Sequence, residues 1–287
     1  MTEEVAALLD AKKFKEAGPI LQAELEAAKA VAATDPHRLM MAHCDLGEFY
    51  QRQYRNADAE KQYNLAIETA KQAFGEDAAE IAKVLDKVAQ MKLSKYEVEE
   101  AKRLWEESLS ILENKLGPDH IEVAIVLGNY SELYRKEANY EKAQDLCTRA
   151  LAIADQAIGD DKPEYIPFLY KLGCLHRAKG DYELAEKLCL KALSIIEATY
   201  GPDDIQVALH RCELATLYRS QGKNTEAVKE LELALETAEK VLDPKDKELG
   251  KIMKSLASMY KRIGRNSEAE RLQEKANSIR YGTLAGR

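Results

Sequence analysis

Small residues recur along this chain with a period of 42 positions. Alanine marks one place in six successive repeats, at Ala59, Ala101, Ala143, Ala185, Ala227 and Ala269. Glycine marks a second place in four of them, at Gly75, Gly117, Gly159 and Gly201. A fixed period of this size is typical of a solenoid, in which each repeat is one supersecondary unit stacked on the next.

The apolar pattern inside one repeat predicts two helices. Four residues lie three or four positions apart and share one helix face, namely Leu169, Leu172, Gly173 and His176. Gly180-Asp181 interrupts this pattern, and a second helix is expected to begin near Tyr182, with Ala185 on its inner face. Gly201-Pro202 should end that helix, because glycine tolerates a left-handed cap and proline cannot continue the helix. The sequence therefore predicts a helical hairpin over residues 169–200.

The hairpins are expected to pack closely and to need their neighbours. A small residue occurs on each first helix, twelve positions before the marker alanine, at Gly47, Ala89, Ser131, Gly173, Ala215 and Ala257. Two small side chains that face each other let helices approach and pack ridge into groove. One pair cannot bury its apolar face alone, so successive pairs must stack. Asp119 or Asp203 is expected to cap the first helix that follows each Gly-Pro stop.

The repeat resembles the tetratricopeptide repeat. The resemblance rests on a small residue, an aromatic residue three positions later, and alanines at twelve and nineteen, as in Ser131, Tyr134, Ala143 and Ala150. The 42-residue period and the Leu-Gly-Pro-Asp-His segment at 116–120 resemble the kinesin light chain variety, since the usual unit has 34 residues. The resemblance implies an all-α fold, a right-handed α-solenoid of stacked antiparallel helix pairs forming a tetratricopeptide-like superhelix.

We expect residues 1–280 to form a single array of about seven helix pairs, followed by a frayed tail at residues 281–287. The first pair is degenerate: Ala17 occupies the marker place and Phe14 supplies the aromatic residue. Gly18-Pro19 is expected to disturb its second helix.

Composition narrows the classes of partner. The chain has 287 residues, 46% hydrophobic and 32% charged, with a formal net charge of -8. Net acidity argues against binding to nucleic acid or to an anionic membrane. No apolar run approaches the roughly 18 residues of a membrane span, and the first residues lack the pattern of a secretory signal. The five cysteines include no C-x-x-C pair, so we expect reduced thiols and a cytoplasmic location.

The most specific candidate site is a column of cations. Arg135, Arg177, Arg219 and Lys261 are spaced by 42 residues, four positions after the small residue of each first helix. In a tetratricopeptide superhelix this place is expected to face the concave groove, with Lys136, Lys171, Lys254 and Arg262 nearby. Arg177, Arg219 and Lys261 have no acidic residue three or four positions earlier, whereas Arg135 follows Glu132 by three. The column would attract an acidic peptide, because arginine grips carboxylates with two parallel bonds. The alternative is that these are solvated helix positions where basic residues are common.

The resemblance to kinesin light chains adds one residue to the peptide-binding candidates. That family binds short peptides with acidic residues around an aromatic one, in a groove rich in asparagine on the first helices. The matching places in this chain are Asp45, Lys87, Asn129, Lys171, Glu213 and Ser255. Only Asn129 fits the pattern, so only Asn129 is carried over as a peptide-binding residue.

The remaining polar and aromatic residues are expected to be structural. Cys147, Cys189, His176 and Trp105 occupy core places of the repeat, and His120 is placed to cap a helix. Cys174 and Cys212 fall on the groove side, where a reactive thiol is an open alternative. Four tyrosines form a periodic stripe that favours the core: Tyr50, Tyr134, Tyr218 and Tyr260. No metal-binding, nucleophile-elbow or phosphate-loop motif occurs, so no cofactor, metal or catalytic residue is expected.

The sequence thus favours a non-catalytic scaffold or adaptor that binds a peptide segment, of acidic character, in its concave groove. The alternative is a peptide-sensing regulatory protein whose superhelix changes shape on binding. A third hypothesis, an enzyme, has little support, because no nucleophile, base and orienting group can be assembled from the spacing. The identity of the partner and the oligomeric state are left open.

Overall fold

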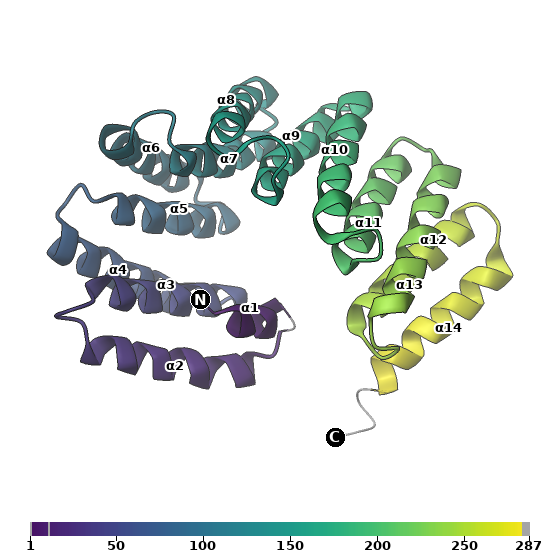
Figure 1. Ribbon diagram of the computed structural model, residues 1–287, viewed down its shortest axis with the longest axis horizontal. Coiled ribbons are helices and arrows are strands. Elements are labelled where there is room, and N and C mark those ends of the chain that lie inside the picture. The colour runs from purple at the N-terminus through teal and green to yellow at the C-terminus, as the bar shows by residue number, and fades with distance from the viewer. Residues whose placement is uncertain (1, 11, 283–287) are drawn as a thin grey trace. The chain divides into compact units, whose positions relative to one another are not determined.

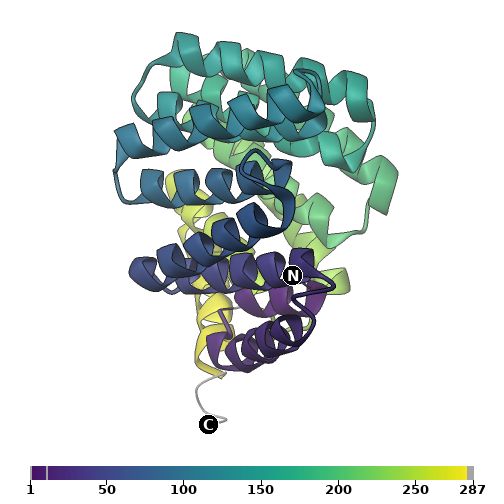
Figure 2. The same ribbon diagram turned by 90° about the vertical axis from the view of Figure 1, so that its left-hand side faces the viewer.

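The computed structural model describes residues 2–10 and 12–282, and these residues form fourteen α-helices and one short 3-10 helix, without a β-strand. The chain divides into two compact units, Met1–Ala138 and Asn139–Arg287. Consecutive helices within each unit pack as antiparallel hairpins (Figures 1 and 2). The all-α fold of paired helices predicted from the 42-residue period is confirmed.

The first unit contains α1 to α7: α1 (Glu3–Asp10), α2 (Phe14–Ala30), α3 (Pro36–Arg52), α4 (Asn56–Phe74), α5 (Ala79–Ser94), α6 (Val98–Leu116) and α7 (Ile121–Lys136). The second unit contains α8 to α14: α8 (Tyr140–Ile158), the 3-10 helix η1 (Pro163–Tyr165), α9 (Ile166–Lys179), α10 (Tyr182–Tyr200), α11 (Ile205–Ser220), α12 (Asn224–Val241), α13 (Lys247–Arg262) and α14 (Asn266–Gly282). The hairpin predicted over residues 169–200 corresponds to α9 and α10.

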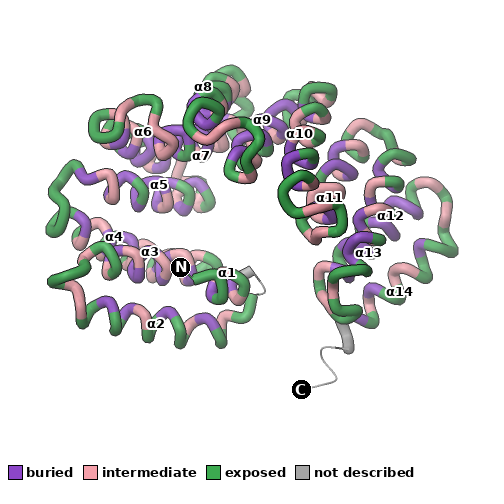
Figure 3. The backbone as a smooth tube through the Cα atoms, viewed as in Figure 1, coloured by how far each residue is buried: buried purple, intermediate pink, exposed green. Residues whose placement is uncertain are grey.

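The marker alanines lie where the helices of a pair approach most closely. Their exposed fractions are 0% or 1% at all six places from Ala59 to Ala269. Opposite Ala185, a Cβ atom added to Gly173 would lie 3.9 Å from the Ala185 carbonyl oxygen and 3.7 Å from the Leu188 Cβ. Buried positions run as stripes along the helices, as Figure 3 shows, and they gather into apolar clusters along the seams between neighbouring helices within each unit.

Two glycines at the equivalent place of different pairs should respond in opposite ways to substitution by alanine. A Cβ on Gly47 would lie 2.6 Å from the Tyr63 ring, whereas a Cβ on Gly173 meets only ordinary contacts of 3.7 Å or more. We expect Gly47→Ala to lower the free energy of unfolding by about 1–3 kcal/mol through overpacking. Gly173→Ala should raise it by up to about 1 kcal/mol, because alanine is the better helix former. Urea denaturation of both variants tests the pair, and a shift of the same sign in both would contradict this account of the seam.

The second helices end at glycine for a specific backbone reason. Gly117 and Gly201 have φ of 93° and 86° with ψ of 157° and 162°. This region is essentially restricted to glycine. It differs from the left-handed cap that we predicted, which has ψ near +47°. The glycines spaced by 42 residues therefore mark the positions where the chain leaves a second helix abruptly and turns toward the next pair.

The caps of the following helices lie one residue later than predicted. His120 and Asp204 directly precede α7 and α11, and their side chains accept hydrogen bonds from the N–H groups of Glu122 and Gln206, at 3.2 and 2.7 Å. The prediction of Asp119 and Asp203 as caps was therefore wrong, because a cap must be the last residue before the helix. Asp203 instead forms an ion pair with Lys240 at 3.0 Å. The capping role predicted for His120 is confirmed.

Five of the turns within pairs carry a contact between side chains five positions apart. In three turns a cation lies over a tyrosine ring: Arg55 over Tyr50 at 4.4 Å, Lys223 over Tyr218 at 5.5 Å, and Arg265 over Tyr260 at 4.0 Å. Two other turns replace this contact with an ion pair or hydrogen bond: Lys92 to Glu97 at 2.9 Å, and His176 Nδ1 to Asp181 at 3.1 Å. His176 is thus a buried structural residue, and the tyrosine stripe serves the turns as well as the core.

Two local expectations need correction. Helix α2 runs without interruption from Phe14 to Ala30 through Gly18-Pro19, because Pro19 lies about one turn inside the helix and removes a single N–H donor. Helix α14 extends to Gly282, so the predicted tail at 281–287 is helical over its first two residues, and residues 283–287 lie outside the described residues. The single array over 1–280 stays a prediction, since the chain divides into two units.

Candidate functional site

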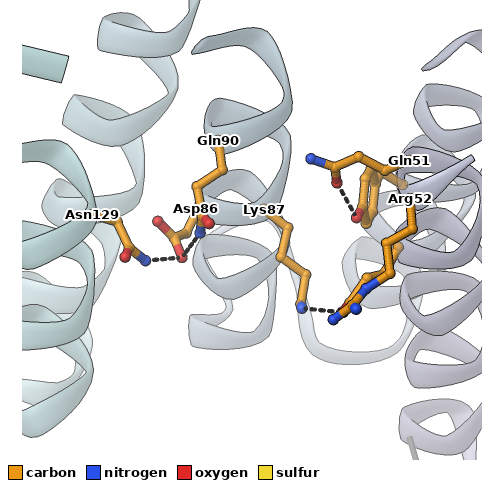
Figure 4. Close-up of polar contacts among 8 residues, drawn as sticks. Gln51, Arg52, Asp86, Lys87, Gln90 and Asn129 are labelled. Carbon is orange, nitrogen blue, oxygen red and sulfur yellow. Dashed lines mark hydrogen bonds and ion pairs between the residues drawn. The ribbon is translucent and has the colours of Figure 1, made fainter. Parts of the chain in front are cut away.

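The first helices of neighbouring pairs in the first unit meet through polar side chains, which Figure 4 shows between α3, α5 and α7. Glu48 of α3 accepts from Arg52 one turn later at 3.0 Å and from Lys87 of α5 at 3.3 Å. Burial tends to raise the pKa of Glu48, but Lys87 and Arg52 hold it below its ordinary value. This carboxylate is therefore ionised and shared by two cations.

A second carboxylate, Asp86 of α5, is almost fully buried, with an exposed fraction of 7%. Its Oδ1 accepts from the Trp105 indole N–H at 2.7 Å, and its Oδ2 accepts from Gln90 at 2.9 Å and Asn129 at 2.8 Å. Three donors from α5, α6 and α7 thus converge on one side chain, and Figure 4 shows those from Gln90 and Asn129. Buried charges persist in proteins when hydrogen bonds satisfy them in this way.

The structure changes how Asn129 must be understood. Its amide donates to Asp86 rather than pointing free into a groove, so one of its N–H groups is already used between α5 and α7. Asn129 is half-buried, and the carry-over from the kinesin light chain pattern stays a prediction.

The cation column is divided between the two units. Arg135 lies in the first unit at the end of α7 and pairs with Glu132 one turn earlier at 2.5 Å. Arg177, Arg219 and Lys261 lie in the second unit, each in the last turn of its helix. In that position they also complement the negative end of the helix dipole, which supports the solvated-position alternative.

The three cations of the second unit differ in their surroundings. Arg177 is half-buried and lines a narrow cleft between α9, α10 and α11 together with Tyr170, Cys174 and Glu213. Arg219 and Lys261 are exposed. Burial in this region raises the pKa of Tyr170 to about 12 and that of Cys189 to about 11. The Cys189 thiol is therefore un-ionised at neutral pH.

The flanking basic residues named from the sequence also fall into the two units. Lys136 is exposed at the end of α7, in the first unit. Lys171 is half-buried on α9, in the second. Arg262 is exposed at the end of α13, and its Nε lies 3.5 Å from the Asn224 side-chain oxygen. Their part in peptide binding stays a prediction.

The residues expected to be structural are found in the core. Trp105 and Cys147 are buried, with exposed fractions of 0% and 3%, whereas Cys189, predicted to be buried, is only half-buried. Cys174 and Cys212 are half-buried, and burial raises the pKa of the Cys212 thiol to about 11, which disfavours its reactive form.

Across the residues that the structure describes, no cluster of three metal-ligating side chains occurs. None of the helices described is both long and apolar enough to cross a bilayer.

Sequence reasoning missed the two carboxylates that join the first helices. Asp86 follows Leu85 on the apolar face of α5, three positions before the small residue Ala89. The equivalent places of the other repeats hold Cys44, Gly128, Tyr170, Cys212 and Lys254, so an acidic residue there was at most a weak signal of a buried hydrogen-bond network. Glu48 gave no such signal, because its partner Lys87 lies 39 residues away.

Comparison with known proteins agrees with this architecture. The tetratricopeptide repeat family matches residues 44–77, 80–156, 122–188, 165–229 and 204–280. No curated protein matches the chain significantly by sequence. A solved structure of kinesin light chain nearly identical TPR-like repeats from Podosopora anserina is similar, with a TM-score of 0.62 and 22% identity over 70% of this chain and 95% of that one.

Two further structures share the fold at low identity. BtubC (BKLC) from P. vanneervenii has a TM-score of 0.58 and 18% identity, over 94% of this chain and 92% of its own. The apo form of RapI has a TM-score of 0.62 and 19% identity, over 96% of this chain and 74% of its own. At these identities the likeness concerns the fold alone. The family matches cover well over half of the sequence, and the chain therefore belongs to the tetratricopeptide repeat family.

Proposed function

We propose that this chain is a non-catalytic scaffold that binds an acidic peptide segment of another protein through the first helices of its second unit. Membership of the tetratricopeptide repeat family implies protein–protein interaction, and such proteins are typically non-catalytic. We choose an acidic ligand because three cations occupy equivalent places of α9, α11 and α13, namely Arg177, Arg219 and Lys261.

These three cations differ from Arg52, Lys87 and Arg135 of the first unit, which are all engaged by carboxylates of the protein itself. Within the part of the chain that the structure describes, Arg177, Arg219 and Lys261 form no ion pair within 4.0 Å. In the first unit, Arg135 is engaged by Glu132, and Lys87 and Arg52 by Glu48. A ligand carboxylate in the second unit would not have to displace an internal partner, which favours that unit as the primary site.

The surrounding side chains define the character of the peptide. Tyr170 is 45% exposed beside Arg177 in the α9–α11 cleft and offers an aromatic contact. Glu213 lies in the same cleft and would repel a carboxylate placed there. We therefore infer a peptide with an apolar anchor next to Tyr170 and acidic residues over Arg219 and Lys261, with Lys171 and Arg262 at the sides.

A pair of synthetic peptides tests this function. The probe carries four glutamates around one tryptophan, and the matched control carries four glutamines in their place. We expect the acidic probe to bind at least about tenfold more tightly, and its affinity to fall between about 50 and 300 mM salt, because exposed charges are screened. Fluorescence anisotropy measures both quantities. Equal affinity for the two peptides, or no dependence on salt, would remove electrostatic recognition from the proposal.

The alternative function, a peptide sensor, is favoured by the division of the chain into two compact units at Ala138. A sensor should change its radius of gyration when the acidic probe binds, whereas a rigid scaffold should keep it. Small-angle scattering with and without saturating probe separates the two functions.

A further inference from the structure

Helix α1 covers only part of the helix with which it is paired. It has 8 residues, whereas α2 has 17 and the first helices of the later pairs have 14 to 17. At 1.5 Å per residue, α1 is about 12 Å long and α2 about 25 Å. A short turn joins α1 to the start of α2, so the short helix lies beside the N-terminal half of the longer one (Figure 1). The C-terminal half of α2 is therefore beyond the reach of α1.

The repeat shows which residues cover this part of the second helix in a complete pair. By the 42-residue period, Glu3 corresponds to Lys87 of α5, so residues 79–86 are the part of α5 without a helical counterpart in α1. This part packs closely on α6. The Ser108 hydroxyl donates to the Ala82 carbonyl oxygen at 2.8 Å, and both residues have exposed fractions of 0%. In the complete pair, two turns at the start of the first helix thus cover the second helix.

The first pair differs at the place of Ser108. The equivalent residues of four other pairs are small and at most 5% exposed, namely Ala66, Ala150, Ala192 and Ala234. In α2 this place holds Glu24, whose side chain is 44% exposed and pairs with Arg38 of α3. Ile20 is 37% exposed, whereas its equivalent in α6, Leu104, is 5% exposed. Both differences show that this stretch of α2 is open where the other pairs are closed.

The open stretch of α2 forms one wall of a groove against α3. Ile20, Ala23 and Ala27 of α2 line it together with Met41 of α3 and Val5 of α1. The groove has a volume of about 840 Å³, so it has room for a segment of chain rather than for a single side chain. Terminal repeats of a solenoid are expected to present a polar outer face. An apolar row at spacings of three and four is instead the kind of surface that receives an amphipathic helix.

Carboxylates outnumber cations around this groove. Glu24 and Asp45 line it with one cation, Arg38, which donates to Glu24 from Nε at 2.8 Å and from Nη2 at 3.0 Å. The hydrogen bond from Arg38 lowers the pKa of Glu24, so this carboxylate is ionised at neutral pH. Glu3 and Glu4 add two exposed carboxylates in the first turn of α1. A ligand with basic residues is complementary to this charge.

We propose that the groove between α2 and α3 binds an amphipathic helical segment of a partner protein, with basic residues beside its apolar face. The segment completes the first pair by taking the place that residues 79–86 take in the α5–α6 pair. Its apolar side chains pack on Ile20, Ala23 and Ala27, and its lysines face the carboxylates of Asp45 and Glu3. The site lies in the first unit, selects the opposite charge from the acidic-peptide site of the second unit, and shares no residue with it.

The probe is a fluorescein-labelled peptide built on the complete pair. Its C-terminal part is Ala-Lys-Ile-Ala-Lys-Val-Leu-Lys, which is residues 79–86 with lysine in place of Glu80 and Asp86. An N-terminal extension of alanine and lysine brings it to about sixteen residues, because shorter isolated helices are marginal in water. We expect saturable binding to the full chain by fluorescence anisotropy. Glutamine at the three places of isoleucine, valine and leucine should weaken binding at least about tenfold, since each buried apolar side chain contributes about 1.5–3 kcal/mol. Glutamate at the lysine places should weaken it as well.

Two matched variants place arginine at exposed alanines. Ala23→Arg/Ala27→Arg fills the groove and repels a basic segment, so it should bind the probe at least about tenfold more weakly. Ala57→Arg/Ala73→Arg adds the same charge at exposed places of α4 outside the groove, and it should bind within about twofold of the wild type. Arginine is a good helix former, so both variants should keep the thermal midpoint of the wild type.

Three results would overturn the proposal: the wild type fails to bind the probe at millimolar concentration, the glutamine peptide binds as tightly as the probe, or the two arginine variants lose affinity alike. The peptide comparison uses the wild-type chain and does not depend on how any variant folds. Sedimentation of the wild type without probe tests another occupant. A dimer that Ala23→Arg/Ala27→Arg dissociates would place a second copy of this chain in the groove and would overturn the partner helix.

Discussion

Replacing Asp86 with alanine is expected to lower the free energy of unfolding by about 3 kcal/mol. The substitution leaves the Trp105 indole N–H, with an exposed fraction of 0%, without an acceptor inside the core. A buried donor without a partner costs about 1–3 kcal/mol, and hydrogen bonds to charged groups contribute about 1.5–3 kcal/mol each. Loss of the contacts with Gln90 and Asn129 adds less, because both side chains are nearer the surface. Relief of the buried charge offsets part of the total.

A double-mutant cycle separates the hydrogen bond from packing. Trp105→Phe keeps most of the ring volume but removes the N–H, so the Asp86→Ala change should cost about 1–3 kcal/mol less in that background. Urea denaturation followed by circular dichroism gives the four values. If Asp86→Ala has the same effect with Trp105 or Phe at that place, the indole bond is not what stabilises the join between α5 and α6.

Reversing two charges in the second unit is expected to weaken acidic-peptide binding by about 100-fold. A surface charge pair at about 4 Å is worth roughly 1 kcal/mol in water, so Arg219→Glu, which turns an attraction into a repulsion, costs about 2 kcal/mol. Arg177→Glu adds a smaller repulsion, because the acidic residues of the peptide lie further from it. The two reversals together approach about 2.7 kcal/mol, or two factors of ten in affinity. Helicity should be unchanged, since neither arginine has an ion pair within the described part of the chain. Anisotropy with the glutamate probe measures the loss.

The matched control reverses a cation that is already neutralised. Arg103→Glu lies on α6, where Arg103 pairs with Glu100 at 2.9 Å and Glu107 at 3.0 Å, so it changes the net charge by the same amount per site. It should leave peptide affinity within about twofold. If Arg103→Glu weakens binding as much as either reversal in the second unit, the total charge of the protein governs binding, and the cation column is not the site.

Much of the fold could be predicted because the residues that specify each helix pair lie close together in the sequence and recur in successive repeats. The marker alanines and the first-helix glycines specify close helix pairs by size alone, and the contacts of Gly173 with Ala185 and Leu188 confirm this. The ends of the second helices could be located because glycine is nearly the only residue that adopts the backbone found at Gly117 and Gly201.

The candidate site could be predicted only in part, because sequence spacing does not reveal contacts between helices. The repeat period placed Arg135, Arg177, Arg219 and Lys261 in one column, but not the boundary at Ala138 that divides them. The repeat period identified Asn129 as a candidate. It did not show that the Asn129 amide donates a hydrogen bond to Asp86, which lies 43 residues earlier in the chain.

The sequence by itself determined that this protein is a stack of helical hairpins, since a 42-residue period of small and apolar residues can be buried in no other simple way. Only the tertiary structure decided which charged residues form ion pairs within the protein and which, among the described residues, do not. The physical reason is that neutralisation depends on distance in space. Glu48 and Lys87 are 39 residues apart in the chain and 3.3 Å apart in the fold, whereas Arg177, Arg219 and Lys261 find no acid within 4.0 Å among the described residues.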